Sequence, residues 1–135
     1  MDNLLPNQRS KQMSLIRSKD TKPELLVRRL VHGLGYRYRL HRADLPGTPD
    51  LVFPSKKKVI FVHGCFWHGH ACRFGRRLPK SRLEYWTQKI QGNSARDKAM
   101  LRRLRGMGWK ILVLWGCQLQ ESQRLATRVT RFLDE

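Results

Sequence analysis

The chain has 135 residues, of which 40% are hydrophobic, and it carries 28 Lys and Arg against 10 Asp and Glu, a formal net charge of +18. This length suits one globular domain, so we expect a single domain over residues 1–135. So basic a surface favours a polyanionic partner, above all nucleic acid. The composition excludes a collagen-like or disordered chain, and the longest strongly apolar run, 109–115, is too short to span a bilayer. An odd number of cysteines, three, argues against a disulfide framework and favours the cytoplasm.

The predicted elements are helices and short strands. A short basic helix is predicted at 7–18, and a second helix at 20–35, where Thr21 and Glu24 have capping-box spacing. In chain order there follow a half-exposed strand at 36–40, a hairpin of strands 48–53 and 58–63, a loop at 64–80, helices at 81–91 and 94–105, a strand at 109–115 and a helix at 122–133. The continuous apolar strand 109–115 is typical of a central strand covered on both faces. The order predicts an α/β (α+β) fold, a mixed β-sheet flanked by helices.

Asp50 is the first candidate for chemistry. It lies between a Pro-Gly turn and an apolar strand, where a carboxylate is costly to bury unless it is paired or binds a metal. If the hairpin turn centres on Lys56 and Lys57, Asp50 lies opposite His63 at one edge of the sheet. The alternative is an aspartate that only accepts hydrogen bonds from loop N–H groups.

Several potential metal ligands follow in the loop. Cys65, His70 and Cys72 are closely spaced, and Cys117, just after the predicted last strand, could return to the same place. Together they would form a closed zinc site of three cysteines and one histidine, which suits a structural ion. The spacing leaves open the alternative that the cysteines are buried thiols without a metal.

His63 and His68 then have no structural task. Near Asp50 they could act as general acid and base, because imidazole titrates near neutral pH. A carboxylate that binds Mg²⁺, with imidazoles around it, suits metal-assisted phosphodiester hydrolysis. The stretch 51–83 holds eight Lys or Arg and no acid, so we expect the phosphate backbone to lie there. The alternative is that each histidine is structural.

Aromatic side chains form a third group. Phe66 and Trp67 are adjacent among polar and basic residues, and Trp86 lies in the next predicted helix. Such rings can wedge between base steps and unstack them, or they can cap a small core of their own loop. Glu24 could supply a second carboxylate, although its spacing from Thr21 fits a helix cap better.

Several strings resemble the very-short-patch mismatch-repair endonucleases. They span roughly residues 9–117 and read Arg9-Ser-Lys-Gln-Met13, Arg17-Ser-Lys-Asp-Thr-Lys-Pro-Glu24, Leu45-Pro-Gly-Thr-Pro-Asp50, Val62-His-Gly-Cys-Phe-Trp-His68, Tyr85-Trp86, Asn93 with Arg96-Asp97, and Gly108-Trp109 through Cys117. The His-Gly-Cys-Phe-Trp-His string is highly specific. The resemblance implies a restriction-endonuclease-like core with a structural zinc loop. It also implies an enzyme that nicks one strand 5′ to the thymine of a T·G mismatch, produced when 5-methylcytosine deaminates.

The resemblance also implies roles for individual residues. The implied catalytic residues are Asp50, His63, His68 and Glu24. The implied metal ligands are Asp50 and the backbone carbonyl of Val62 for Mg²⁺, and Cys65, His70, Cys72 and Cys117 for a structural Zn²⁺. The implied DNA contacts are Met13, Phe66, Trp67, Trp86, Lys89 and Asn93, together with the basic N-terminal helix within residues 1–19. Val62 stands where the best-known members carry Thr.

The expected partner is double-stranded DNA with a T·G mismatch. We expect a monomer in the bacterial cytoplasm, associated with the nucleoid during repair, with transient contacts to other repair proteins and none to a membrane. Two alternatives stay open. One is a nuclease of the same fold with a different DNA substrate. The other is a non-catalytic, zinc-stabilised DNA-binding module, which leaves Asp50, His63 and His68 without a joint explanation.

Overall fold

A computed structural model describes residues 21–65 and 82–135. In chain order its elements are α2 (Lys22–Gly33), β1 (Arg39–Leu40), β2 (Leu51–Phe53), the 3₁₀ turn η1 (Pro54–Lys56), β3 (Lys58–His63), α3 (Leu83–Gly106), β4 (Lys110–Trp115), the 3₁₀ turn η2 (Gly116–Gln118) and α4 (Ser122–Asp134). Outside the described residues lie the predicted helix within 1–19 and most of the predicted loop, with Met13, Phe66, Trp67, His68, His70 and Cys72.

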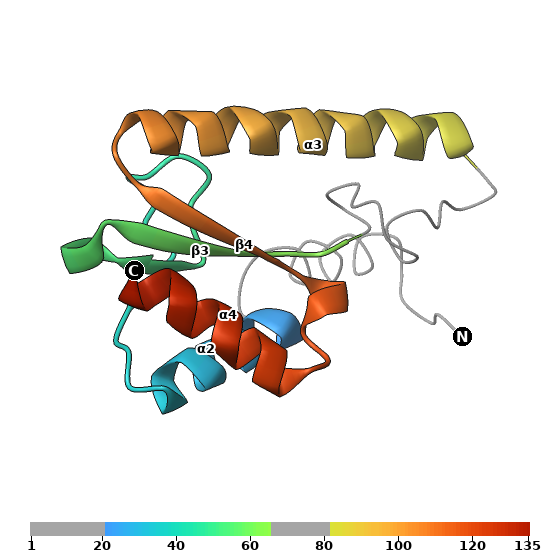
Figure 1. The fold of residues 1–135 in the computed structure, drawn as a ribbon. Helices are drawn as coiled ribbons and strands as arrows, with labels where there is room; N and C mark the ends of the chain where they lie inside the picture. The colour runs from blue at the N-terminus through green and yellow to red at the C-terminus, as the bar shows by residue number, and fades with distance from the viewer. Residues whose placement is uncertain (1–20, 66–81) are drawn as a thin grey trace, which may run out of the picture.

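The strands form one mixed sheet of four strands in the order β1-β2-β3-β4. The pairs β1–β2 and β2–β3 are antiparallel, whereas β3 and β4 run parallel. Helix α3 lies over one face of the sheet, and α2 and α4 lie side by side over the other (Figure 1). The mixed α/β architecture predicted from the sequence is confirmed.

Each face of the sheet is closed by its own apolar cluster. Val31 of α2 and Leu125 of α4 pack with Ile60 on one face. Leu104 of α3 packs with Phe61 on the other. Successive residues of a strand point to opposite faces, so β3 contributes alternately to both clusters. Each fully buried aliphatic side chain contributes roughly 1.5–3 kcal/mol, and the two clusters together fix the sheet between the helices.

The predicted position of the last strand is wrong. Within the described sheet β4 is an edge strand that pairs with β3 alone, not a central one. Its coverage is as predicted, because Leu114 packs in the α2 and α4 cluster and Val113 packs against the α3 cluster. An apolar run indicates that both faces of a strand are covered. It carries no information about hydrogen-bonded neighbours.

Helix α3 is one helix of 24 residues, not the two that the sequence predicted. A glycine inside a helix, here Gly92, costs only about 1 kcal/mol. Buried Ile90 and Leu104 anchor the helix on both sides of that point. The helix begins at Leu83 after Arg82, whose backbone is left-handed with φ 56°, and no side chain caps it there. No helix among the described residues combines the length and apolarity needed to cross a membrane.

The hairpin of β2 and β3 is confirmed, but its predicted register is wrong. Leu51 pairs with Ile60, so the pairing is shifted by two residues from the one that would set Asp50 opposite His63. The cause is the turn, in which η1 is followed by Lys57 with a left-handed φ of 53°. This places the centre of the turn one residue earlier than predicted. A shift of two residues leaves every side chain on its predicted face.

Buried Lys58 ties the start of β3 to the end of α4. Its Nζ donates hydrogen bonds to the carbonyls of Phe132 at 2.6 Å and Leu133 at 3.2 Å. We predict that Lys58→Met lowers the free energy of unfolding by about 1–3 kcal/mol, because it leaves buried carbonyls without a donor. Urea denaturation measures this. The neighbouring exposed Lys57→Met is the control and should change stability by less than about 0.5 kcal/mol; equal effects of both variants would contradict the role of Lys58.

Candidate active site

Three side chains from three segments converge beside the sheet. Glu24 lies in the first turn of α2, His41 directly follows β1, and Asp50 directly precedes β2. Their carboxylate and imidazole donor atoms all lie within 4.8 Å of one another. The structure therefore brings together the two predicted carboxylates and adds a histidine that the sequence analysis missed. His41 belongs to no motif; its one sequence signal is its place just before the Pro-Gly turn that leads to Asp50.

Glu24 is positioned by the start of α2. The hydroxyl of Thr21 accepts a hydrogen bond from the amide of Glu24 at 3.4 Å, which confirms the predicted cap. The carboxylate of Glu24 binds Arg28 and His41, and the residue is only 2% exposed. The helix cap thus fixes the backbone, and the side chain serves the cluster.

Asp50 is held by a neighbouring strand. Its Oδ2 accepts a hydrogen bond from the amide of Val62 at 2.6 Å. The preceding turn needs Gly47, whose φ is +77° and whose missing Cβ would lie 3.3 Å from the ring of Phe61. The amide that donates to Asp50 thus belongs to β3 and not to the loop that carries Asp50. The other carboxylate oxygen, Oδ1, faces His41 and lies 4.0 Å from its Nε2.

The carboxyl group of Glu24 affects the ionisation of Asp50. Burial, and then a hydrogen bond to Glu24, raise the pKa of Asp50 to about 8, while the amide of Val62 acts in the opposite direction. Two carboxylates in a poorly solvated site ionise together only at high cost unless a cation lies between them. Oxygen donors of this kind suit a divalent cation, so these residues could hold one.

His63 lies at the carboxyl end of β3, one residue beyond the strand residue that binds Asp50. It is 7% exposed and lies between two rings, 5.4 Å from the centre of Phe61 and 5.2 Å from that of Trp115. It is not one of the three residues of the carboxylate cluster. The structure therefore places it near the chain segment that anchors Asp50, on the same face of the sheet as Phe61.

Two predicted zinc ligands meet at the same end of the sheet. Because β3 and β4 are parallel, Cys65 and Cys117 both follow the carboxyl ends of their strands. The amide of Cys117 donates a hydrogen bond to Sγ of Cys65 at 3.4 Å. The predicted ligands His70 and Cys72 lie outside the described residues.

The start of α3 carries an aromatic and basic cluster. The rings of Tyr85 and Trp86 pack edge to face with centres 5.2 Å apart, and Nζ of Lys89 lies 5.8 Å from each ring centre. Residues Trp86, Lys89 and Asn93 share one side of the helix by their spacing. Figure 1 shows this end of α3 extending beyond the sheet, on the side where β3 ends.

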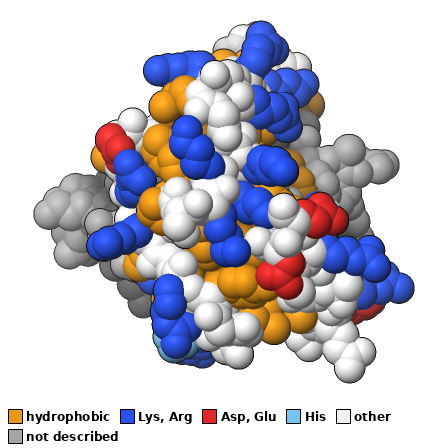
Figure 2. Space-filling view, turned by 60° about the vertical axis from the view of Figure 1, so that its left-hand side comes forward, with side chains coloured by type: hydrophobic (Ala, Val, Ile, Leu, Met, Phe, Trp, Pro, Cys, Tyr) orange, Lys and Arg blue, Asp and Glu red, His pale blue; other side chains and the backbone are white. Residues whose placement is uncertain are grey.

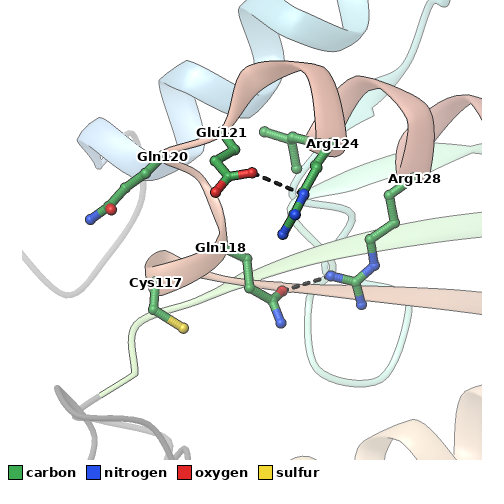
Figure 3. Close-up of a pocket in the computed structure, with 7 residues that line it drawn as sticks. Cys117, Gln118, Gln120, Glu121, Arg124 and Arg128 are labelled. Carbon is green, nitrogen blue, oxygen red and sulfur yellow. Dashed lines mark hydrogen bonds and ion pairs between the residues drawn. The ribbon is translucent and has the colours of Figure 1, made fainter.

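A hollow of about 330 Å³ lies at the start of α4 (Figure 3). Its cations are already engaged: Arg124 forms an ion pair with Glu121 at 2.9 Å, and Arg128 donates to Gln118 at 2.7 Å. Cys117 lines the same hollow (Figure 3). The carboxylate cluster, not this hollow, therefore has the composition of a catalytic site.

Basic side chains cover much of the surface. In Figure 2 Lys and Arg are scattered over the whole face shown, and acidic side chains occur at few points. Two carboxyl groups and an imidazole beside a mixed sheet, on so basic a chain, are features typical of nucleases.

The chain belongs to the DNA mismatch endonuclease Vsr family, whose family model matches residues 1–74. It is therefore an endonuclease of DNA mismatch repair that acts on DNA, and membership implies a restriction-endonuclease-like fold, with which the mixed sheet and flanking helices agree.

Curated relatives cover nearly the whole chain. The chain is 54% identical over 133 residues to the type II nicking enzyme V.XorIIP of Xanthomonas oryzae, covering 98% of this chain and 97% of that protein. It is 40% identical over 129 residues to the type II nicking enzyme V.NmeAIP of Neisseria meningitidis, covering 96% and 91%. It is 40% identical over 128 residues to the DNA mismatch endonuclease Vsr of Escherichia coli, covering 94% and 81%.

The raised pKa of Asp50 predicts that the stability of the folded protein falls as pH rises. An unfolded Asp loses its proton near pH 4, whereas folded Asp50 keeps its proton up to about pH 8. Asp50 therefore lowers the stability of the folded protein progressively as pH rises from about 4 to 8, and fully above 8. We predict that Asp50→Asn, measured by thermal melts without divalent cations, stabilises the protein by at least about 1 kcal/mol at pH 8.5, and by little at pH 4.

Asp44→Asn is the matched control for this prediction. The hydrogen bond from Arg42 lowers the pKa of Asp44, so its removal should give no gain in stability at high pH. A stability difference between Asp50→Asn and the unmodified protein that does not change with pH would contradict the raised pKa.

Proposed function

We propose that the protein nicks one DNA strand 5′ to the thymine of a T·G mismatch, with a divalent cation of the Mg²⁺ type at the carboxylate cluster. The observation that carries this proposal is the close approach of the Glu24 and Asp50 carboxyl groups, since it calls for a cation. The names of the relatives support strand nicking and mismatch recognition. On this proposal the whole chain works as one domain and as a monomer, making transient contacts with other repair proteins.

The catalytic roles follow from the positions of the side chains. Asp50 and Glu24 would hold the cation, with the backbone carbonyl of Val62 as a further oxygen ligand; Val in place of Thr leaves that carbonyl unchanged. When bound, the cation polarises a phosphoryl oxygen and stabilises the charge that develops on it. His63 and His68 would transfer protons to and from the water and the leaving oxygen. The packing of His63 between two rings supports this role, because it holds the imidazole in one orientation.

DNA recognition is assigned to the end of the molecule where β3 ends and α3 begins. Trp86, Lys89 and Asn93 on α3 would contact the bases and backbone near the mismatch. Exposed Tyr85 and the cations beside it support this assignment, because aromatic rings flanked by basic groups suit stacked bases and phosphates. Phe66, Trp67 and Met13 would wedge into the base stack, and residues 1–19 would follow the backbone.

A structural zinc ion is proposed at Cys65, His70, Cys72 and Cys117. The contact between the Cys117 amide and the Cys65 sulfur supports it, since metal-bound thiolates commonly accept backbone amide hydrogen bonds. The ion would link the chain after β3 to the chain after β4 and so hold the loop that carries Phe66, Trp67 and His68.

The catalytic assignment predicts that Asp50→Ala lowers the single-turnover nicking rate by at least about 10²-fold, the scale of losing one electrostatic or acid–base group. Binding to the mismatched duplex should remain within a few-fold of the unmodified protein. End-labelled duplexes with T·G, with T·A or with other mismatches, in varied flanking sequence, measure both rate and substrate choice.

The exposed Asp44→Ala is the control and should nick normally. Equal loss of binding and cleavage in Asp50→Ala would contradict a catalytic role for Asp50. Equal cleavage of paired and T·G duplexes would instead favour a nuclease of the same fold with a different DNA substrate. Mismatch binding with no cleavage in any cation would favour the non-catalytic DNA-binding module.

The zinc assignment makes a separate prediction. The purified protein should contain about one zinc ion per chain, and Cys117→Ser should reduce both the zinc content and the melting temperature, because metal binding is linked to folding. Metal analysis and thermal melts measure this. The variant Asp50→Ala should keep its zinc, and a melting temperature that is insensitive to removal of the metal would exclude a structural ion.

A further inference from the structure

His41 has a left-handed backbone conformation. Its φ is 46°, a left-handed value that is rare outside glycine. Its side chain is only 16% exposed. The imidazole lies beside the carboxyl groups of Glu24 and Asp50, and these contacts point to its role.

The imidazole faces both carboxyl groups through one atom. Nε2 of His41 lies 2.9 Å from Oε1 of Glu24 and 4.0 Å from Oδ1 of Asp50. Donors that share one small divalent ion lie about 3 Å apart when adjacent and about 4.2 Å apart when opposite, given metal–ligand bonds of about 2.1 Å. The two separations are close to these values.

Each of the two carboxylates has another partner on the side away from this shared space. The Val62 amide binds Oδ2 of Asp50, and Arg28 binds Oε2 of Glu24. The atoms that face one another are therefore Oδ1, Oε1 and Nε2. The surrounding protein holds the two carboxylates from outside and directs two oxygens and one nitrogen toward a common point.

We propose that His41 is a nitrogen ligand of the divalent cation and that it raises the affinity of this site for Mn²⁺ relative to Mg²⁺. This inference rests on the proposed metal site at Glu24 and Asp50. Mg²⁺ strongly prefers oxygen ligands, whereas first-row ions such as Mn²⁺ accept imidazole more readily. The competing role is that of a positioning residue, in which His41 only orients Glu24 through its hydrogen bond.

The test measures metal binding by the full-length protein without DNA, independently of cleavage. Mn²⁺ affinity is measured by electron paramagnetic resonance, Mg²⁺ affinity by competition, and the electron spin-echo spectrum detects nitrogen bound to Mn²⁺. His41→Gln keeps a polar group that can hydrogen-bond Glu24 but removes the imidazole. The exposed His32→Gln, at the other end of α2, is the matched control.

We expect His41→Gln to weaken Mn²⁺ binding by at least about 10-fold, to leave Mg²⁺ binding within about 3-fold, and to remove the bound-nitrogen signal. His32→Gln should change none of these. An equal weakening of both ions, unchanged Mn²⁺ affinity, or a nitrogen signal that persists in His41→Gln would overturn the inference.

Two further results separate this inference from the proposed function. Absence of bound nitrogen in the unmodified protein would overturn the role of His41, even if His41→Gln folds poorly. Retention of Mn²⁺ binding in Asp50→Asn would instead overturn the metal site itself. Loss of Mn²⁺ in Asp50→Asn, with its retention in His41→Gln, would leave the proposed function standing and assign His41 to positioning alone.

Discussion

The approach of two carboxyl groups in a chain with few acids is the constraint on which the site depends. Glu24 is fixed by the helix cap at Thr21, and Asp50 is fixed by the Val62 amide and the turn at Gly47. Glu24 is buried and the side chain of Asp50 is only 19% exposed, so water screens their repulsion weakly. The two groups therefore favour a proton or a cation between them. The raised pKa of Asp50 means that, without a cation, Asp50 keeps its proton.

The parallel pairing of β3 and β4 gathers the other candidate groups at one end of the molecule. His63 pairs in register with Trp115, and Cys65 and Cys117 follow directly. The start of α3 extends over the same end (Figure 1). Chain segments far apart in the sequence therefore reach one region through a single pair of strands, so the proposed chemistry, zinc ligation and base contacts become neighbours there.

Short-range sequence patterns predicted most helices and strands, but they did not predict how the strands pair. The cap at Thr21, the hairpin and the bounds of β3 depend on residues close in sequence, and the structure confirms them. The edge position of β4 depends on which strands pair, and the register of the hairpin depends on the left-handed backbone of Lys57. Hydrophobic periodicity predicts neither of these. His41 was missed for the same reason, because only the folded chain sets it between Glu24 and Asp50.

The fold does not require an ionisable carboxyl group at Asp50. Its one backbone contact, to the Val62 amide, requires only an oxygen acceptor, which an asparagine side chain also offers. An asparagine would avoid the cost of ionising a buried acid beside Glu24. The folded protein instead carries a carboxyl group that weakens it at neutral pH in the absence of cations. This carboxyl group costs stability and adds no backbone contact that an asparagine would lack. Its presence is best explained by what it binds, because a divalent cation that binds both ionised carboxylates would offset that cost.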